Sequence, residues 1–187
     1  MVKRIFDLIL SLGLIVLFSI PMLVIAALIR LMSKGPAMFW TDRVGTNNRI
    51  FKMAKFRTMK LNTPQVATHL MENPEEYLII GGEFLRKYSI DELPQLFNVL
   101  NGEMSFVGPR PALFNQDDLI ELRTKKNIHK LVPGVTGWAQ VNGRDDLSIP
   151  VKVSFDEHYL NHHSFAFDLY IVLLTVIKVV KREGVQH

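Results

Sequence analysis

Hydrophobic residues are concentrated near the two ends of this 187-residue chain. Residues 8–29 contain no charged side chain, and a helix of about 22 residues is about 33 Å long, which is sufficient to cross the hydrocarbon core of a bilayer. A second, shorter apolar segment covers residues 165–180, with Asp168 near its start and Lys178 near its end. The pattern therefore predicts a membrane helix at the N-terminus and an apolar helix at the C-terminus.

The N-terminal helix has two features that disfavour a simple crossing of the membrane. Pro21, with Ser19 close by, interrupts the segment near its middle, and proline removes a helical hydrogen bond and bends the axis. Basic residues flank both ends, namely Lys3, Arg4, Arg30 and Lys34. The positive-inside rule then places both ends on the cytoplasmic side. Because proline-kinked spanning helices are common, these features leave two alternatives open, a spanning helix and a re-entrant one that breaks at residues 19–21.

The C-terminal apolar segment also allows two interpretations. Its length and flanking aromatic residues are typical of a helix that lies in or against the membrane surface, and they also suit a helix buried in a core. Asp7, at the start of the N-terminal segment, is expected either to cap the helix or to pair with a nearby arginine, capping being the simpler prediction.

Between the apolar segments the pattern is mixed and divided by glycine and proline. One or two strands are predicted within 37–58, around a turn at 45–48, and a loop or short helices within 60–80. Further predictions are helices at 82–88, 91–100 and 115–130, and loops at 105–111 and 133–144. The second of these helices should end at Asn101-Gly102, because glycine is a favoured C-terminal cap.

Composition excludes some classes of protein. The chain has no cysteine, so it has neither a disulfide framework nor a cysteine zinc site. The formal net charge is +4, but the basic residues are dispersed and do not form a stripe with aromatic residues between them. We therefore expect no nucleic-acid partner. Anionic head groups or a phosphorylated substrate account for the positive charge equally well.

The most informative candidate for chemistry is the acidic pair Asp91-Glu92, at the predicted start of the helix 91–100. Acidic residues are common there because of the helix dipole, and that preference alone could explain the pair. The same helix end would also favour a bound phosphate. A carboxylate beside a phosphate needs cations, and the candidates are Lys55, Arg57, Arg86 and Arg110. Of these, Arg110 lies between two prolines, an unusual setting for a solvated surface charge.

Several longer motifs accompany this pair. They are the Lys-Arg-x-x-Asp start, the proline-interrupted apolar segment, Arg43-Val44-Gly45, Lys55-Phe56-Arg57-Thr58-Met59, Asp91-Glu92-Leu93-Pro94-Gln95, and the segments 104–111 and 133–144. In this order the sequence resembles the bacterial sugar transferase family, the monotopic phosphoglycosyl transferases that act on polyprenol phosphates. Two positions depart from the family pattern: Ile20 separates Ser19 from Pro21, and Thr41 stands where glutamine is often found.

The resemblance implies a covalent mechanism. Asp91, in the nucleophile position, would attack the sugar-proximal phosphorus of a UDP-sugar and expel UMP, and a polyprenol (undecaprenyl) phosphate would then attack the aspartyl intermediate. Mg²⁺ is the expected cofactor, with Asp91 and Glu92 as its candidate ligands. Neighbouring helical residues point about 100° apart, so the two acids are expected to differ in role, Glu92 serving in metal binding or proton handling. Lys55, Arg86 and Arg110 would hold phosphates, and Arg57 is a further candidate.

The glycine-rich segment 133–144 has two interpretations. By resemblance it belongs to nucleotide or substrate binding, the candidates being Pro133, Gly134, Thr136, Gly137, Gln140 and Arg144. The alternative is structural, with glycines for tight backbone turns and Trp138 as a membrane-interface anchor. His158 and His162 have a spacing suited to a metal on one helix face, but a tertiary or interfacial role is the stronger prediction.

The resemblance also implies an architecture. We expect a mostly helical α+β protein with a re-entrant helix-break-helix at 1–34 and a small catalytic domain with amphipathic interfacial helices at 35–187. The catalytic domain would lie on the cytoplasmic face of the bacterial inner membrane, at the first membrane step of glycoconjugate assembly. Two other classes fit less well. A phosphohydrolase would need an Asp-x-Asp signature, and a membrane-anchored scaffold or nucleic-acid binder would leave the acidic and basic motifs unexplained. The sequence leaves the sugar and the oligomeric state open, a homo-oligomer included.

Overall fold

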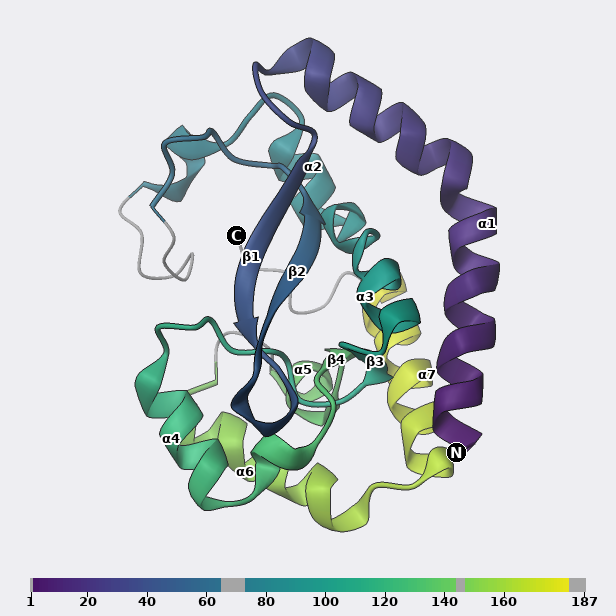
Figure 1. Ribbon diagram of the computed structural model, residues 1–187, viewed down its shortest axis with the longest axis vertical. Helices are drawn as coiled ribbons and strands as arrows, with labels where there is room; N and C mark the ends of the chain where they lie inside the picture. Colours follow the sequence, from purple (N-terminus) through teal and green to yellow (C-terminus); the bar gives the residue numbers. More distant parts are fainter. Residues whose placement is uncertain (1, 65–72, 144–146, 182–187) are drawn as a thin grey trace.

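The computed structural model describes residues 2–64, 73–143 and 147–181, and its architecture is α+β and mostly helical. Figure 1 shows a two-stranded hairpin in the middle of the molecule with a long N-terminal helix along one side. The described helices are α1 (Val2–Met32), α2 (Gly82–Lys87), α3 (Gln95–Asn101), α4 (Asp117–Lys125), α5 (Trp138–Asn142), α6 (Ile149–His162) and α7 (Phe165–Lys181). Helix α6 was not predicted from the sequence.

Helix α1 is continuous across Pro21, although its axis visibly changes direction partway along (Figure 1). The expected helix-break-helix is therefore a bent helix, because the loss of one hydrogen bond at proline bends an axis without ending the helix. Within the described part of the chain, α1 is the one helix long and apolar enough to cross a membrane. Its buried residues are few, and large side chains such as Leu17 and Leu23 are mostly exposed.

The hairpin forms as the sequence predicts. Strand β1 (Met38–Val44) pairs antiparallel with β2 (Ile50–Phe56), so that Met38 lies opposite Phe56 and Val44 opposite Ile50. Asn47 and Asn48 in the turn adopt left-handed backbone conformations, with φ of 55° and 59°. Asparagine tolerates this conformation better than most residues, which is why the chain reverses here.

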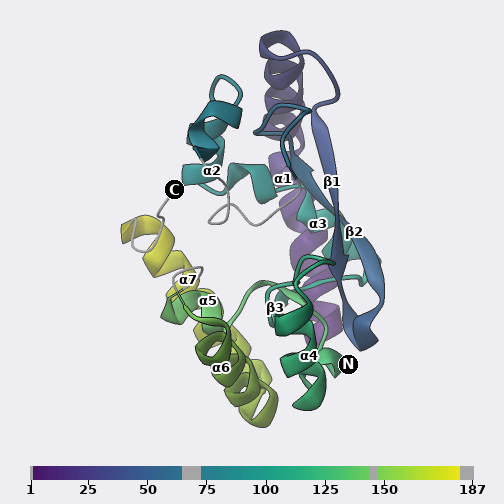
Figure 2. The same ribbon diagram turned by 90° about the vertical axis from the view of Figure 1, so that its left-hand side faces the viewer.

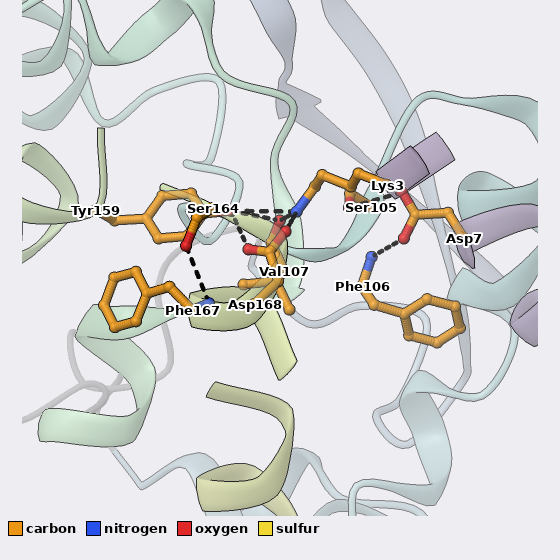
Figure 3. Close-up of polar contacts among 9 residues, drawn as sticks. All are labelled: Lys3, Asp7, Ser105, Phe106, Val107, Tyr159, Ser164, Phe167 and Asp168. Carbon is orange, nitrogen blue, oxygen red and sulfur yellow. Dashed lines mark hydrogen bonds and ion pairs between the residues drawn. The ribbon is translucent and has the colours of Figure 1, made fainter. Parts of the chain in front are cut away.

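The first turns of α1 are bound to later parts of the chain by charged side chains, as Figure 3 shows for two of them. The ammonium group of Lys3 donates to Asp168 Oδ2 at 2.6 Å, to the Val107 carbonyl at 2.9 Å and to the Tyr159 hydroxyl at 3.1 Å. Asp7 accepts hydrogen bonds from the Ser105 hydroxyl and the Phe106 amide. The prediction that Asp7 caps α1 or pairs with an arginine was therefore wrong, because its partners are nearly a hundred residues away.

Both ends of α1 are attached to the part of the chain that follows it. Near the start, Arg4 donates to the carbonyls of Val99 and Leu100 at the end of α3. After the last turn, the buried Arg57 donates to the carbonyls of Ser33 and Lys34 at 2.9 and 2.6 Å. Arg57 follows β2 directly, so the hairpin and α1 are held together at this end.

A second, smaller sheet was missed by the sequence prediction of loops at 105–111 and 133–144. Strand β3 (Ser105–Val107) pairs parallel with β4 (Gly134–Thr136). Beyond this pair the backbones approach so closely that a Cβ atom on Gly134 would lie 2.1 Å from the Gly108 nitrogen. A Cβ on Gly137 would lie 2.1 Å from the Gly108 carbonyl oxygen. The glycines are thus required by close packing of two backbones.

Helix α7 has one face buried in the core and an apolar face that is exposed, so it has features of both predicted alternatives. Ile171 and Asp168 on one face are buried, whereas Leu173 and Val176 on the other are more than half exposed. Trp138 of α5 packs in an aromatic cluster with α6 and α7, its ring centroid 5.1 Å from that of Phe167. Figure 2 shows α5, α6 and α7 gathered on the side of the molecule away from the hairpin.

Candidate active site

The acidic pair lies in a short 3-10 turn, η4 (Ile90–Glu92), between α2 and α3. Helix α3 starts only at Gln95, with Pro94 at its N-cap. The prediction that one helix begins near Asp91 was therefore wrong. Ser89, with φ of 53°, reverses the chain before the pair, and the acids precede α3. Their position does not follow from a preference for acids in the first turn of that helix.

Cations from distant segments surround the pair. Lys55, on β2, donates to Glu92 Oε1 at 2.7 Å, and its nitrogen lies 3.6 Å from Asp91 Oδ2. The Arg110 guanidinium donates to the same Glu92 oxygen at 2.8 Å. Asp91 is buried and Glu92 nearly so. The structure thus brings together four residues that the sequence proposed for one site.

The two carboxyl groups differ in electrostatics. Burial raises the pKa of Asp91, an effect that Lys55 opposes and that the neighbouring Glu92 reinforces. Burial would raise the pKa of Glu92 as well, but the charges and hydrogen bonds of Arg110 and Lys55 hold it well below its usual range. Glu92 is consequently a fixed anion, whereas the Asp91 carboxylate is desolvated and more basic, as a nucleophile should be.

The other predicted phosphate ligands have different positions. Arg86, in the last turn of α2, donates to the sulfur of Met59 at 3.4 Å, and its charge lowers the pKa of Asp91, so it lies near that carboxyl group. Arg57 is different, since both of its terminal nitrogens bind backbone carbonyls at the end of α1. These contacts give Arg57 a structural role and lend its predicted phosphate contact no support.

A cavity of about 170 Å³ adjoins Glu92 and Arg110. Its wall also includes Thr136, Gln140, Lys152 and Thr175, so α5, α6 and α7 all reach the site. Gln140 is buried, and among the described residues neither atom of its amide makes a hydrogen bond. A buried amide without partners is costly unless a ligand satisfies it, which supports the predicted role of Gln140 in substrate binding.

Most contacts of the other residues in the glycine-rich segment are with the backbone of neighbouring segments. Pro133 accepts a hydrogen bond from the Ser105 amide, and Gly134 donates to the Pro109 carbonyl. Thr136 lines the cavity and shares a hydroxyl hydrogen bond of 2.7 Å with Thr175. Gly137 is crowded by Gly108, and Arg144 lies outside the described residues. The binding and structural interpretations therefore apply to different residues of one segment.

Lys152 and Thr175 of the cavity wall were not predicted from the sequence, and neither was an ion pair beside the cavity. Arg123 of α4 lines the cavity and is nearly buried, and it forms an ion pair with Asp156 of α6 at 2.6 Å. Arg123 is one of several basic residues on a polar helix. A pairing across 33 residues left no local signal in the sequence.

The donor set suits Mg²⁺ better than a transition metal. The described residues contain no group of three or more His, Cys, Asp or Glu placed to hold a metal ion. Magnesium is usually held by only one or two carboxylates together with substrate phosphates and water, and Asp91 and Glu92 can supply two. His158 is exposed and stacks on Trp138 with ring centroids 5.9 Å apart, in agreement with the tertiary role expected for it.

Comparison with known proteins gives consistent matches over the whole chain. The model of one protein family, bacterial sugar transferase, matches residues 1–182. An uncharacterized sugar transferase, EpsL of Bacillus subtilis, is 42% identical over 187 residues, covering 99% of this chain and 90% of the relative. The UDP-glucose:undecaprenyl-phosphate glucose-1-phosphate transferase of Escherichia coli is 39% identical, over 95% of this chain and 40% of the relative. A UDP-N-acetylgalactosamine-undecaprenyl-phosphate N-acetylgalactosaminephosphotransferase of Aeromonas hydrophila is 38% identical, over 98% of this chain and 44% of the relative.

Proposed function

The chain belongs to the bacterial sugar transferase family, and from this premise we propose that it transfers a sugar 1-phosphate from a UDP-sugar to undecaprenyl phosphate. The products are a polyprenol diphosphate-sugar and UMP. The general reaction is supported by the relatives, which are named as undecaprenyl-phosphate sugar phosphotransferases and hence as phosphoglycosyl transferases. Those relatives differ in their named sugars, so the sugar used by this enzyme does not follow from them.

The observation that carries the proposal is the inequality of the two buried acids. Asp91, with its raised pKa, is the nucleophile, and one of its oxygens attacks the sugar-proximal phosphorus. The bond from that phosphorus to the bridging oxygen breaks, and UMP leaves with the electron pair. Lys55, Arg86 and Arg110 offset the negative charge of the phosphates, which otherwise repels an anionic nucleophile.

The second step regenerates the carboxylate. An oxygen of the lipid phosphate attacks the phosphorus of the aspartyl sugar-phosphate, and Asp91 leaves as the free anion. Neither step requires net proton transfer, because the attacking groups and leaving groups are all anions. Glu92 stays ionised throughout and keeps Lys55 and Arg110 in place.

Mg²⁺ fits as the cofactor of this site. Asp91 and Glu92 would hold it together with the donor phosphates, and when bound it would neutralise phosphate charge. Two cations already contact one oxygen of Glu92, so the protein supplies part of the charge compensation itself.

We place the catalytic domain on the cytoplasmic face of the membrane, with α1 re-entrant. Support comes from the attachment of both ends of α1 to one domain, by Arg4 near the start and Arg57 at the end. A spanning helix would separate those ends by the membrane thickness, about 30 Å. The chain has no cysteine, so single cysteines at Val2 and Trp40, both exposed, can be labelled without background. We expect both cysteines to be labelled from the same side of the membrane. Labelling from opposite sides would show that α1 spans the membrane.

The chemical proposal is tested by intact-protein mass spectrometry. The membrane-embedded protein is mixed with UDP-sugars and Mg²⁺ without lipid acceptor, and a mass increase of one sugar phosphate is expected. Asp91→Asn should abolish the adduct, whereas Asp42→Asn, which alters a half-exposed acid paired with Lys52, should keep it. An adduct that survives Asp91→Asn excludes Asp91 as the nucleophile. With radiolabelled donor and undecaprenyl phosphate, label in extractable lipid supports transfer, and free sugar phosphate indicates a hydrolase.

A further inference from the structure

One basic residue of helix α4, Arg123, is buried, unlike the other basic residue in its last turn. Arg123 is 8% exposed, whereas Lys125 on the same helix forms an exposed pair with Glu121. The Arg123 guanidinium is turned inward, where its Nε and Nη2 donate to Asp156 Oδ2 at 3.0 and 2.6 Å. Asp156 is 1% exposed, so both charges of this pair are removed from water. Burying an ion pair is a poor means of stabilising a helix contact, because the desolvation of two charges offsets much of their attraction.

The third nitrogen of the Arg123 guanidinium binds the backbone of the loop that carries Arg110. Its Nη1 donates to the carbonyl oxygen of Arg110 at 2.8 Å. Arg110 stands between Pro109 and Pro111, and each of these prolines lacks an amide hydrogen with which the loop could bind. The loop is instead held through its carbonyl groups.

Three successive carbonyls of this loop each receive a hydrogen bond from a different part of the fold. The Gly134 amide donates to Pro109 at 2.9 Å, and Arg43 donates to Pro111 at 3.2 Å. Arg123 supplies the donor between them, at the residue whose side chain reaches Glu92. The backbone of Arg110 is therefore fixed at the point from which its guanidinium projects.

We infer that Arg123 and Asp156 are positioning residues for phosphosugar transfer, which hold the Arg110 guanidinium against Glu92 and beside the donor phosphates. The inference rests on the proposed function. A continuous series of polar contacts runs from Asp156 on α6 through Arg123 on α4 and the backbone of Arg110 to Glu92. Arg123 also lines the cavity, but all three of its nitrogens bind protein atoms, so it acts on the reaction through Arg110.

The experiment is a double-mutant cycle on the full-length enzyme in membranes. Arg123→Lys keeps the charge but lacks the planar fork that binds Asp156 and Arg110 at once. It should lower kcat/KM by about 10- to 100-fold, since a displacement of about 1 Å in a positioning group has effects of that order. In an Arg110→Ala background, the same substitution should change kcat/KM by less than about 2-fold, because the group being positioned is gone. Lys125→Ala, on the exposed face of α4, is the matched control and should match the wild type in both backgrounds.

The split between KM and kcat supplies a readout that a purely structural residue would not move. Arg110 lines the cavity and contacts Glu92, so displacing its guanidinium should alter the KM for the UDP-sugar and kcat in a characteristic ratio. Arg123→Lys should change the two constants in the same ratio as Arg110→Ala. Asp156→Asn, which keeps the shape and one acceptor oxygen, should reproduce both the rate loss and this ratio.

The outcomes separate this inference from the proposed function. Equal rate losses from Arg123→Lys with and without Arg110 would overturn the positioning role, as would a split between KM and kcat unlike that of Arg110→Ala. Failure of both Arg123→Lys and Asp156→Asn to fold would also overturn it, in favour of a structural pair. Absence of any transfer or adduct in the wild type would instead overturn the proposed function itself.

Discussion

Replacing Gly134 with alanine decides between the two interpretations of the glycine-rich segment. The added Cβ would lie 2.1 Å from the Gly108 nitrogen and 2.4 Å from the Thr136 oxygen, and both of these are backbone atoms that cannot rotate away. The two backbones must therefore separate by about 1 Å or more to reach an ordinary contact distance. That movement breaks the hydrogen bonds from Gly108 to Thr136 and from Gly134 to Pro109, each 2.9 Å long.

The size of the effect follows from these contacts. Two buried hydrogen bonds contribute about 1 kcal/mol each, and overpacking adds about 1–3 kcal/mol, so the free energy of unfolding should fall by about 3–5 kcal/mol. For a chain of this length 1 kcal/mol corresponds to about 2–4 °C, which predicts a Tm lower by roughly 6–20 °C. Because Pro109 precedes Arg110, transfer activity should fall as well.

The measurement is thermal unfolding of the purified protein in one detergent, followed by circular dichroism, with UMP binding measured below the transition. Gly13→Ala is the control, since a Cβ at Gly13 on α1 meets nothing within 4 Å and alanine favours a helix. A Tm for Gly134→Ala within 2 °C of the wild type, with weakened UMP binding, would refute the packing argument. The glycine would then serve close approach of a nucleotide.

Three further predictions concern the carboxylate pair and the N-terminal contacts. Glu92→Gln removes a charge that raises the pKa of Asp91, so the acid limb of the variant's residual adduct-formation rate should move to lower pH. Lys55→Met removes a charge that lowers the same pKa, so the acid limb should move to higher pH. Both rates are measured by mass spectrometry at a series of pH values. Asp91→Asn should unfold at a higher temperature than the wild type at pH 7. A carboxyl group with a raised pKa destabilises the native state as pH rises through that pKa, so the difference should vanish at acid pH. Lys3→Met leaves the buried Asp168 without its cation, so Tm should fall by several degrees, and the double variant with Asp168→Asn should recover part of the loss.

The sequence predicted elements whose cause is local. The hairpin follows from a turn with asparagines that adopt positive φ, and α3 ends at Gly102, whose φ of 85° is the left-handed conformation of a helix cap. The pairing of β3 with β4 joins short segments almost thirty residues apart, each too short for an alternating pattern. Local reasoning also put Asp91 into the helix that starts four residues later. Neither the parallel pairing nor the 3-10 turn has a signature that a single sequence reveals.

In the candidate site, the sequence identified suitable residue types but did not show where each side chain would lie. Lys55, Arg86 and Arg110 were recognised as cations for a phosphate site, yet Arg57, from the same motif as Lys55, binds the end of α1. Residue type alone does not separate these roles. Successive residues of a strand point to opposite faces, so residues two apart, such as Lys55 and Arg57, would share a face, but β2 ends at Phe56, between them. The backbone leaves the strand after Phe56, and the regular alternation that would place both cations on one face ends with it.

The basic residues near the N-terminus have both a predicted role in membrane topology and observed contacts with the rest of the chain. Lys3 and Arg4 suggested a cytoplasmic helix end by the positive-inside rule, and in the structure they bind the domain through Asp168 and the end of α3. These roles are compatible if the rest of the chain lies on the cytoplasmic face, as we propose, because a basic residue kept on that side is then also kept beside its partners. Asp7 continues the attachment one turn further along, at the strand β3 that precedes the Arg110 loop. Helix α1 is therefore linked to the loop that carries Arg110 through one short strand, so we expect a displacement of α1 to move this proposed phosphate-binding cation as well.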